Sequence, residues 1–195
     1  MIDEIVLATG NKGKIREFSG LLEGVFGRII SLNDLESPPE VVEDGATFRE
    51  NALKKARAIA AYSGKPALAD DSGLAVDALG GSPGVYSARY AGEGATDRDN
   101  IAKLLTELGG IENRSASFVC VLALVAPGGE EITAEGKCEG VIITEPRGEG
   151  GFGYDPVFYL PEYGKTMAEI PPELKNRISH RARAAEALIK LVHTS

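Results

Sequence analysis

The stretch LADDSGLAVDALGGSPGVYSARYAG, Leu68–Gly92, places two adjacent aspartates directly after an apolar segment and follows them with small residues. Residues 65–73, KPALADDSG, read as a strand that runs into a turn. A solvated turn, in which an aspartate caps its own backbone, accounts for one Asp and one Gly. It does not require Asp70, Asp71, Ser72 and Gly73 together. Carboxylates at a strand end also hold a hard cation or orient a water nucleophile.

The segments on either side of this stretch predict an α/β protein. Upstream, residues 47–64 form a helix pattern that starts with a Thr47–Glu50 capping box, and residues 5–11 form a buried strand before a helix at 12–22. Downstream, residues 96–110 predict a capped helix, 115–143 a β-hairpin that turns at Gly128 and Gly129, and 180–193 a closing helix. We find no repeat and no dividing linker. The expectation is one domain, 1–195, with a central mixed sheet.

Composition narrows the class of protein. The chain has 195 residues, 43% of them hydrophobic, and a net charge of −8, which argues against a general nucleic-acid binder. It holds no apolar run of the ~20 residues that a membrane span needs. Its first ten residues, MIDEIVLATG, lack the basic residues of a secretory signal, so we expect a cytoplasmic protein. Cys120 and Cys138 are expected to be reduced structural thiols.

One segment and two single residues before the aspartate pair could bind anions or a cation. Residues 9–14, TGNKGK, lie at a strand-to-helix junction, where glycines, helix-end amides and lysines favour phosphate; the spacing is not that of a Walker A loop. Lys55 lies beside the apolar stripe of its helix, where it could face a cleft or be a surface lysine. Glu43 is a possible metal ligand, although an isolated loop glutamate is usually solvated.

Two segments near the C-terminus could bind a base or an anion. Residues 148–156, GEGGFGYDP, carry Phe152 and Tyr154 on a glycine-rich, flexible backbone, and either ring could stack on a planar base or plug the loop. Residues 175–183 concentrate positive charge near a helix start, which an anionic ligand would relieve. These segments together match the parts of a nucleoside triphosphate.

The sequence closely resembles the inosine/xanthosine triphosphate pyrophosphatase family. The matching segments are LATGNKGKIREF, FRENALKKARA, ADDSGLAVDALGGSPGVYSARYAG, FGYDPVF and ISHRARA, in family order and over most of the chain. The resemblance implies Mg²⁺-dependent hydrolysis of non-standard purine nucleoside triphosphates (ITP, dITP and XTP) between the α and β phosphates, which cleans the nucleotide pool. It also implies a mixed sheet with two lobes flanking a nucleotide cleft, and a homodimer.

The resemblance also implies roles for particular residues. Asp71 would be the catalytic base and, with Glu43, a magnesium ligand, and Asp70 would support it. Ser72 and Lys55 would contact the substrate. The phosphates would be cradled by Thr9, Gly10, Asn11, Lys12, Gly13 and Lys14. The base and sugar would be bound by Phe152, Gly153, Tyr154 and Asp155, and base recognition would be completed by Lys175, His180 and Arg181.

Other functions stay open on the sequence alone. A pyrophosphatase for another modified nucleotide would share the phosphate motifs and differ in the base-recognition loop. A nucleotide-binding sensor without turnover would need no catalytic base, which the presence of Asp71 and Glu43 disfavours. A nucleic-acid-binding module is disfavoured by the acidic charge balance.

Overall fold

The aspartate pair lies inside a strand and not at its end. In the computed structural model, which describes residues 2–194, strand β3 runs without interruption over Ala67–Val76. The expected turn at residues 70–73 is therefore wrong. In the sheet β3 lies between β1, which pairs with it as far as Leu68, and β4.

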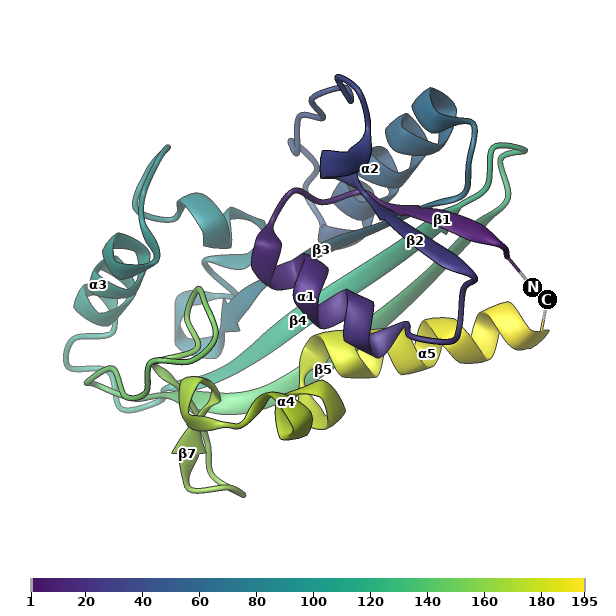
Figure 1. The fold of residues 1–195 in the computed structure, drawn as a ribbon. Coiled ribbons are helices and arrows are strands. Elements are labelled where there is room, and N and C mark those ends of the chain that lie inside the picture. The colour runs from purple at the N-terminus through teal and green to yellow at the C-terminus, as the bar shows by residue number, and fades with distance from the viewer. Residues whose placement is uncertain (1, 195) are drawn as a thin grey trace. The chain divides into compact units, whose positions relative to one another are not determined.

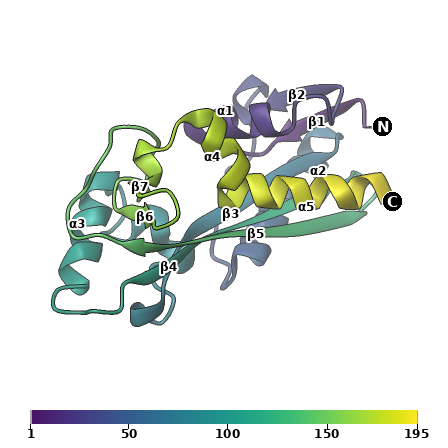
Figure 2. The ribbon, with the colours of Figure 1, turned by 90° about the horizontal axis from the view of Figure 1, so that it is seen from below.

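The sheet is mixed, as expected, and its seven strands are ordered β2-β1-β3-β4-β5-β6-β7. β1 (Glu4–Leu7) is parallel to β2 (Arg28–Ser31) and to β3. The predicted hairpin is confirmed as β4 (Ser115–Val125) and β5 (Glu131–Ile142), joined by a turn in which the Gly129 N–H donates to the Ala126 carbonyl. The short antiparallel strands β6 (Phe158–Leu160) and β7 (Lys165–Thr166) follow β5 (Figure 2).

The chain divides into two compact units. The first comprises the residues up to Asp71, 120–136 and those from Arg181 onward, and the second comprises 72–119 and 137–180. Each of β3, β4 and β5 contributes residues to both units. The sequence analysis found no such division because the boundaries between the units fall within strands. A strand lacks the Pro-, Gly- and Ser-rich composition by which a linker is recognised.

In the first unit, helices pack on both faces of the sheet (Figure 1). Helix α1 (Lys12–Leu21) and helix α5 (His180–Thr194) share one buried cluster with Leu68 and Leu122, whereas helix α2 (Phe48–Ser63) shares another with Ala69 and Val121. The alternation along each strand follows from the two-residue period of β structure, which sends successive side chains to opposite faces.

The predicted helix starts are confirmed. Thr47 caps α2 and Thr96 caps helix α3 (Asp97–Glu107), and each threonine forms a reciprocal capping box with the acid three residues later. Gly64 ends α2 with a φ of 65°, a conformation that glycine adopts without the penalty of a Cβ atom.

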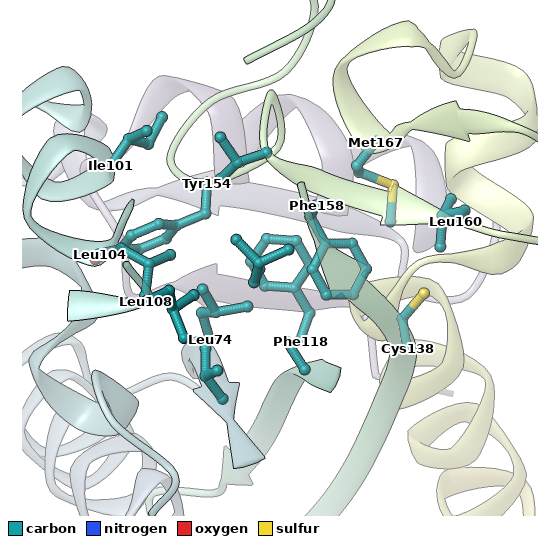
Figure 3. Close-up of a cluster of buried hydrophobic side chains, with 14 of the residues drawn as sticks. Leu74, Ile101, Leu104, Leu108, Phe118, Cys138, Tyr154, Phe158, Leu160 and Met167 are labelled. Atoms are coloured by element: carbon teal, nitrogen blue, oxygen red, sulfur yellow. The ribbon is translucent and has the colours of Figure 1, made fainter. Parts of the chain in front are cut away.

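The second unit has its own core around Phe118 and Phe158, whose ring centroids lie 4.3 Å apart (Figure 3). Helix α3 packs on this core through Ile101 and Leu104. The short helix α4 (Pro172–Ile178), which the sequence analysis missed, begins with a proline at its first position. Four 3₁₀ turns complete the described elements: η1 (Leu32–Asp34), η2 (Asp77–Leu79), η3 (Gly84–Arg89) and η4 (Met167–Glu169).

Both cysteines are buried: Cys120 packs in the α1–α5 cluster and Cys138 in the core of the second unit. Over residues 2–194, no helix combines the length and the apolar character needed to cross a membrane.

Candidate functional site

Asp70 is a fully buried carboxylate paired with cations from helices α1 and α5. Its Oδ2 lies 2.8 Å from Lys14 Nζ and 3.9 Å from Arg181 Nε, and the residue is 1% exposed. Burial opposes its ionisation, but Lys14, Arg181 and Lys55 outweigh burial and lower the pKa of Asp70 to about 2. Asp70 is therefore a permanent anion that anchors two cationic side chains.

Asp71, the next residue, faces helix α2 and has the opposite pKa shift. Its Oδ2 accepts a 3.0 Å hydrogen bond from Asn51 Nδ2, and its Oδ1 lies 3.9 Å from Lys55 Nζ. Burial, together with the charge of nearby Glu43, raises the pKa of Asp71 to about 6 against the lowering effect of Lys55 and Asn51. The group that sequence analysis named as the base is thus more basic than an ordinary aspartate.

Lys55 holds the two carboxylates expected to bind magnesium. Its Nζ lies 2.9 Å from Glu43 Oε2 as well as near Asp71. Burial would lower the pKa of Lys55, but the charges of Asp70, Asp71 and Glu43 raise it above its ordinary value. Lys55 is consequently a half-buried ammonium ion that faces carboxylates, and the surface-lysine alternative is wrong.

The donor set around Lys55 fits a hard divalent cation that is completed by substrate. Among residues 2–194, no group of three or more His, Cys, Asp or Glu side chains gathers to hold a metal ion. Mg²⁺ commonly takes one or two carboxylates and fills its other positions with water and substrate phosphate oxygens. Glu43 and Asp71 supply such a pair because both approach the same ammonium.

The TGNKGK segment forms the start of helix α1. Asn11 caps the helix, its Oδ1 accepting from the backbone N–H groups of Gly13 (2.9 Å) and Lys14 (3.1 Å), while the Asn11 N–H donates to Thr9 Oγ1. Two of the helix-end amides expected to meet phosphate are therefore engaged by Asn11. An anion at this end would meet the lysine side chains first, that of Lys12 being exposed.

Arg181 lies with the aspartate cluster of the first unit. Its Nη1 lies 3.0 Å from Glu17 Oε2, and its Nε faces Asp70. The sequence grouped Arg181 with Lys175 and His180 as base-recognition residues, and that role stays a prediction. The sequence analysis missed Glu17, whose position one turn after Lys14 on α1 was the available signal.

A second cluster, in the second unit, joins Asp155, Lys175 and Phe152. Lys175 Nζ lies 2.7 Å from Asp155 Oδ2, which also accepts a 3.0 Å hydrogen bond from the Phe152 N–H. The Lys175 ammonium lies 5.2 Å from the centroid of the Phe152 ring, in cation–π range. Lys175 comes from α4, so its approach to Asp155 depends on a helix that the sequence did not reveal.

The glycine-rich loop around this cluster is held closely and is not the free backbone that the sequence suggested. The Gly150 N–H donates to the Ala168 carbonyl, and the Gly153 N–H donates to Asp97 Oδ2 at 2.7 Å. A Cβ atom on Gly150 would lie 2.7 Å from the Ala168 oxygen. The glycines therefore allow a close backbone approach.

The remaining predicted residues of this unit differ in exposure. Tyr154 is buried in the core, and its hydroxyl donates to the Ser87 carbonyl at 2.7 Å, which leaves Phe152 as the better placed ring for stacking. His180 is buried and stacks on Phe118 with 4.8 Å between the centroids. Ser72 is half-buried in β3 directly after Asp71.

Asn51 is the most informative residue that the sequence analysis passed over. It is 1% exposed, donates to Asp71 Oδ2, and accepts from the Gly45 N–H at 2.8 Å. Its place one turn before Lys55 on α2 was visible, but its two partners come from a loop and a strand that only the fold brings together.

The fold and these two clusters define the class: an α/β protein whose buried carboxylates and lysines are suited to polyphosphate chemistry. The chain belongs to the Ham1 family, whose model matches residues 5–191, and this confirms the resemblance drawn from the motifs. A dITP/XTP pyrophosphatase of Geobacter sulfurreducens is 57% identical over 95% of this chain and 94% of the relative. One of Bacillus subtilis is 51% identical over 98% of both chains.

Solved structures agree with this assignment. A HAM1 protein from Coxiella burnetii covers 100% of both chains with a TM-score of 0.90 and 46% identity. The Staphylococcus aureus Ham1 protein covers 98% of this chain and 99% of that one, with a TM-score of 0.89 and 44% identity. The fold class predicted from the sequence, α/β with a central mixed sheet, is confirmed.

Proposed function

We propose that this protein hydrolyses the non-standard purine nucleoside triphosphates ITP, dITP and XTP to the monophosphate and pyrophosphate. The observation that carries the proposal is the Asp71–Lys55–Glu43 cluster in a chain whose close relatives are named dITP/XTP pyrophosphatases. Such an activity removes damaged purine nucleotides from the precursor pool.

The first-unit cluster supplies the groups that the triphosphate end of the substrate needs. Lys14 and Lys55 are cations held in place by Asp70, Asp71 and Glu43, so they meet phosphate oxygens without losing further side-chain freedom. A preorganised cation stabilises the charge that develops on a departing pyrophosphate. We propose that Thr9, Asn11 and Lys12 at the start of α1 complete the contacts to phosphate.

We propose that Asp71 orients and polarises the attacking water. A carboxylate beside bound Mg²⁺ has a low basicity, so Asp71 would act mainly by orienting the water, and Asn51 and Lys55 hold the carboxylate in position. Mg²⁺, for which Glu43 and Asp71 are the proposed ligands, would supply charge neutralisation of the phosphate oxygens when bound.

We propose that the second-unit cluster reads the base. Phe152 offers a ring for stacking, and Lys175 and His180 are donor residues for the purine 6-oxygen of hypoxanthine or xanthine. Adenine carries an amino group at that position. A buried donor left without an acceptor costs roughly 1–3 kcal/mol, which corresponds to discrimination of about five- to 150-fold.

The test is pyrophosphate release from ITP, dITP, XTP, GTP, ATP and UTP, each with Mg²⁺ and with EDTA. We expect magnesium-dependent release from ITP, dITP and XTP and little from ATP or GTP. Orthophosphate as the first product would reject cleavage between the α and β phosphates. Preferred turnover of UTP would favour a pyrophosphatase for another modified nucleotide.

A sensor without turnover is separated from an enzyme by the Asp71→Asn variant. If the protein is an enzyme, the wild type releases pyrophosphate from ITP, whereas the variant binds ITP but releases no pyrophosphate. We further propose a cytoplasmic homodimer. Sedimentation velocity at several protein concentrations measures its stoichiometry, and a monomer at every concentration would reject the dimer.

A further inference from the structure

The loop before helix α2 is attached to the first two turns of that helix by a series of side-chain contacts. Each of the helix residues 50, 51, 54 and 55 contacts one loop residue. The residue number of the loop partner decreases as that of the helix residue increases. The pairs are Glu50 with Ala46, Asn51 with Gly45, Lys54 with Asp44 and Lys55 with Glu43. The loop therefore runs back along the helix with each residue in a defined place.

Asn51 and Lys55 are the helix residues of this series whose side chains also reach strand β3. Lys55 does so through its charge, 3.9 Å from Asp71 Oδ1, and Asn51 through a hydrogen bond. Asn51 Oδ1 accepts from the Gly45 N–H at 2.8 Å, and Asn51 Nδ2 donates to Asp71 Oδ2 at 3.0 Å. A backbone N–H only donates, so the amide oxygen must face Gly45 and the amide nitrogen must face Asp71. One buried side chain thus joins the loop that carries Glu43 to the strand that carries Asp71.

Gly45 provides an independent observation at the same place. A Cβ atom on this residue would lie 2.6 Å from Asn51 Oδ1 and 2.9 Å from Glu50 Cβ. Contacts that short do not occur without a shift of one partner, so the loop backbone approaches Asn51 at a distance that only glycine permits. Both partners suit this contact, because the loop has a glycine and the helix has an amide oxygen where they meet.

We propose that Asn51 is a positioning residue that fixes the Glu43 and Asp71 carboxylates relative to each other, and thereby sets the affinity of the pair for a divalent cation. The inference rests on the proposed function for the identity of the two ligands. Residues that hold metal ligands through hydrogen bonds typically contribute 10- to 100-fold in metal affinity or activity. Asn51 meets that description from two sides, whereas Lys54 holds only Asp44.

The experiment compares Asn51→Leu, which removes both hydrogen bonds at similar volume, with Lys54→Ala, which breaks an exposed contact of the same series. The readouts are the Mn²⁺ dissociation constant, measured without substrate by electron paramagnetic resonance, and kcat and KM for ITP at saturating and limiting Mg²⁺. For Asn51→Leu we expect Mn²⁺ binding about 10- to 100-fold weaker, and a larger loss in kcat than in KM. Lys54→Ala should match the wild type in both readouts.

A second variant covers the case in which Asn51→Leu does not fold. Gly45→Ala moves the Asn51 amide from the loop side while every side chain of the cluster remains, and it should weaken Mn²⁺ binding in the same direction. Wild-type Mn²⁺ affinity in a folded Asn51→Leu or Gly45→Ala protein would overturn the proposal, as would an equal loss in Lys54→Ala. If the wild type releases no pyrophosphate, the proposed function fails, and the Mn²⁺ measurement still tests the role of Asn51.

Discussion

Asp70 and Asp71 have opposite pKa shifts because neighbouring residues of a strand point to opposite faces of the sheet. Asp70 shares its face with Leu68 and meets the cations of α1 and α5, which hold its pKa at about 2. Asp71 shares its face with Ala69 and meets Lys55 and Asn51 of α2, where burial prevails and its pKa is about 6. One is a fixed anchor, and the other titrates near pH 6 in the metal-free protein.

The two aspartates therefore predict opposite effects of pH on the stability of metal-free protein. The pKa of Asp71 is raised from 3.8 to about 6, so the folded state loses stability as the pH rises through this window. The cost of ionisation above pH 6 is about 3 kcal/mol at most. In EDTA, Asp71→Asn should be more stable than the wild type at pH 7.5 and equal to it near pH 4, as measured by urea denaturation.

Asp70→Asn is the matched control and should show the reverse. The pKa of Asp70 is lowered from 3.8 to about 2, so its stabilising effect is complete above pH 4 and disappears as the pH falls through 2. The variant removes the buried counter-ion of Lys14 and a carboxylate that faces Arg181 besides Glu17, so it should lose roughly 2 kcal/mol or more at pH 7.5. Equal stability changes in the two variants would contradict the assignment of the aspartates to different faces.

At the scale of an element, the loop of residues 148–156 shows how glycines determine the position of a charged side chain. Gly151 has a φ of 74°, and a Cβ atom there would overlap Asp155 Oδ2, the oxygen that binds Lys175. Helix α4 supplies the lysine, and the loop supplies the aspartate, whose Oδ2 lies 2.7 Å from Lys175 Nζ. A larger residue at position 151 must move the aspartate.

We predict that Gly151→Ala weakens substrate binding out of proportion to its effect on stability. Losing the alignment of Asp155 and Lys175 should raise KM for ITP about tenfold or more, since hydrogen bonds to charged groups contribute ~1.5–3 kcal/mol each. Gly94→Ala is the control: Gly94 has a φ of 75°, and a Cβ atom there meets nothing within 4 Å. Both variants carry similar backbone strain, so a similar KM for the two would refute the argument.

At the scale of the whole molecule, three buried clusters divide the apolar side chains, two in the first unit and one in the second. Each cysteine belongs to a different unit and is completely enclosed. Burial raises the pKa of the Cys120 thiol well above its ordinary value, so the reactive thiolate is suppressed.

The thiols therefore report on the integrity of each unit. Native protein should show no thiol that reacts rapidly with a disulfide reagent, and two should react in 6 M guanidinium chloride, about the concentration that unfolds most domains. Peptide mapping after partial denaturation identifies which cysteine reacts first. Rapid labelling of Cys120 in the native protein would contradict the burial described here.

The motifs alone predicted the family, the helix starts and the β4–β5 hairpin, because capping boxes, glycine turns and strand alternation are local properties of the chain. They also predicted site roles for Asp70, Asp71, Glu43, Lys55 and Lys175, which the structure places in ion-pair clusters. Local pattern failed at residues 70–73, where small and acidic residues are typical of a turn. The strand nevertheless continues through these residues, and cations from two helices compensate the buried charge of Asp70.

Only the tertiary structure decided which residues share a site. Asn51 meets Asp71 across 20 positions, and Arg181 meets Glu17 across 164. No local pattern encodes such pairs, since they depend on how helices pack against the two faces of the sheet. The sequence determines the chemical type of each side chain. The pKa of a carboxylate and the hydrogen-bond partner of an amide depend on the residues that folding places beside them.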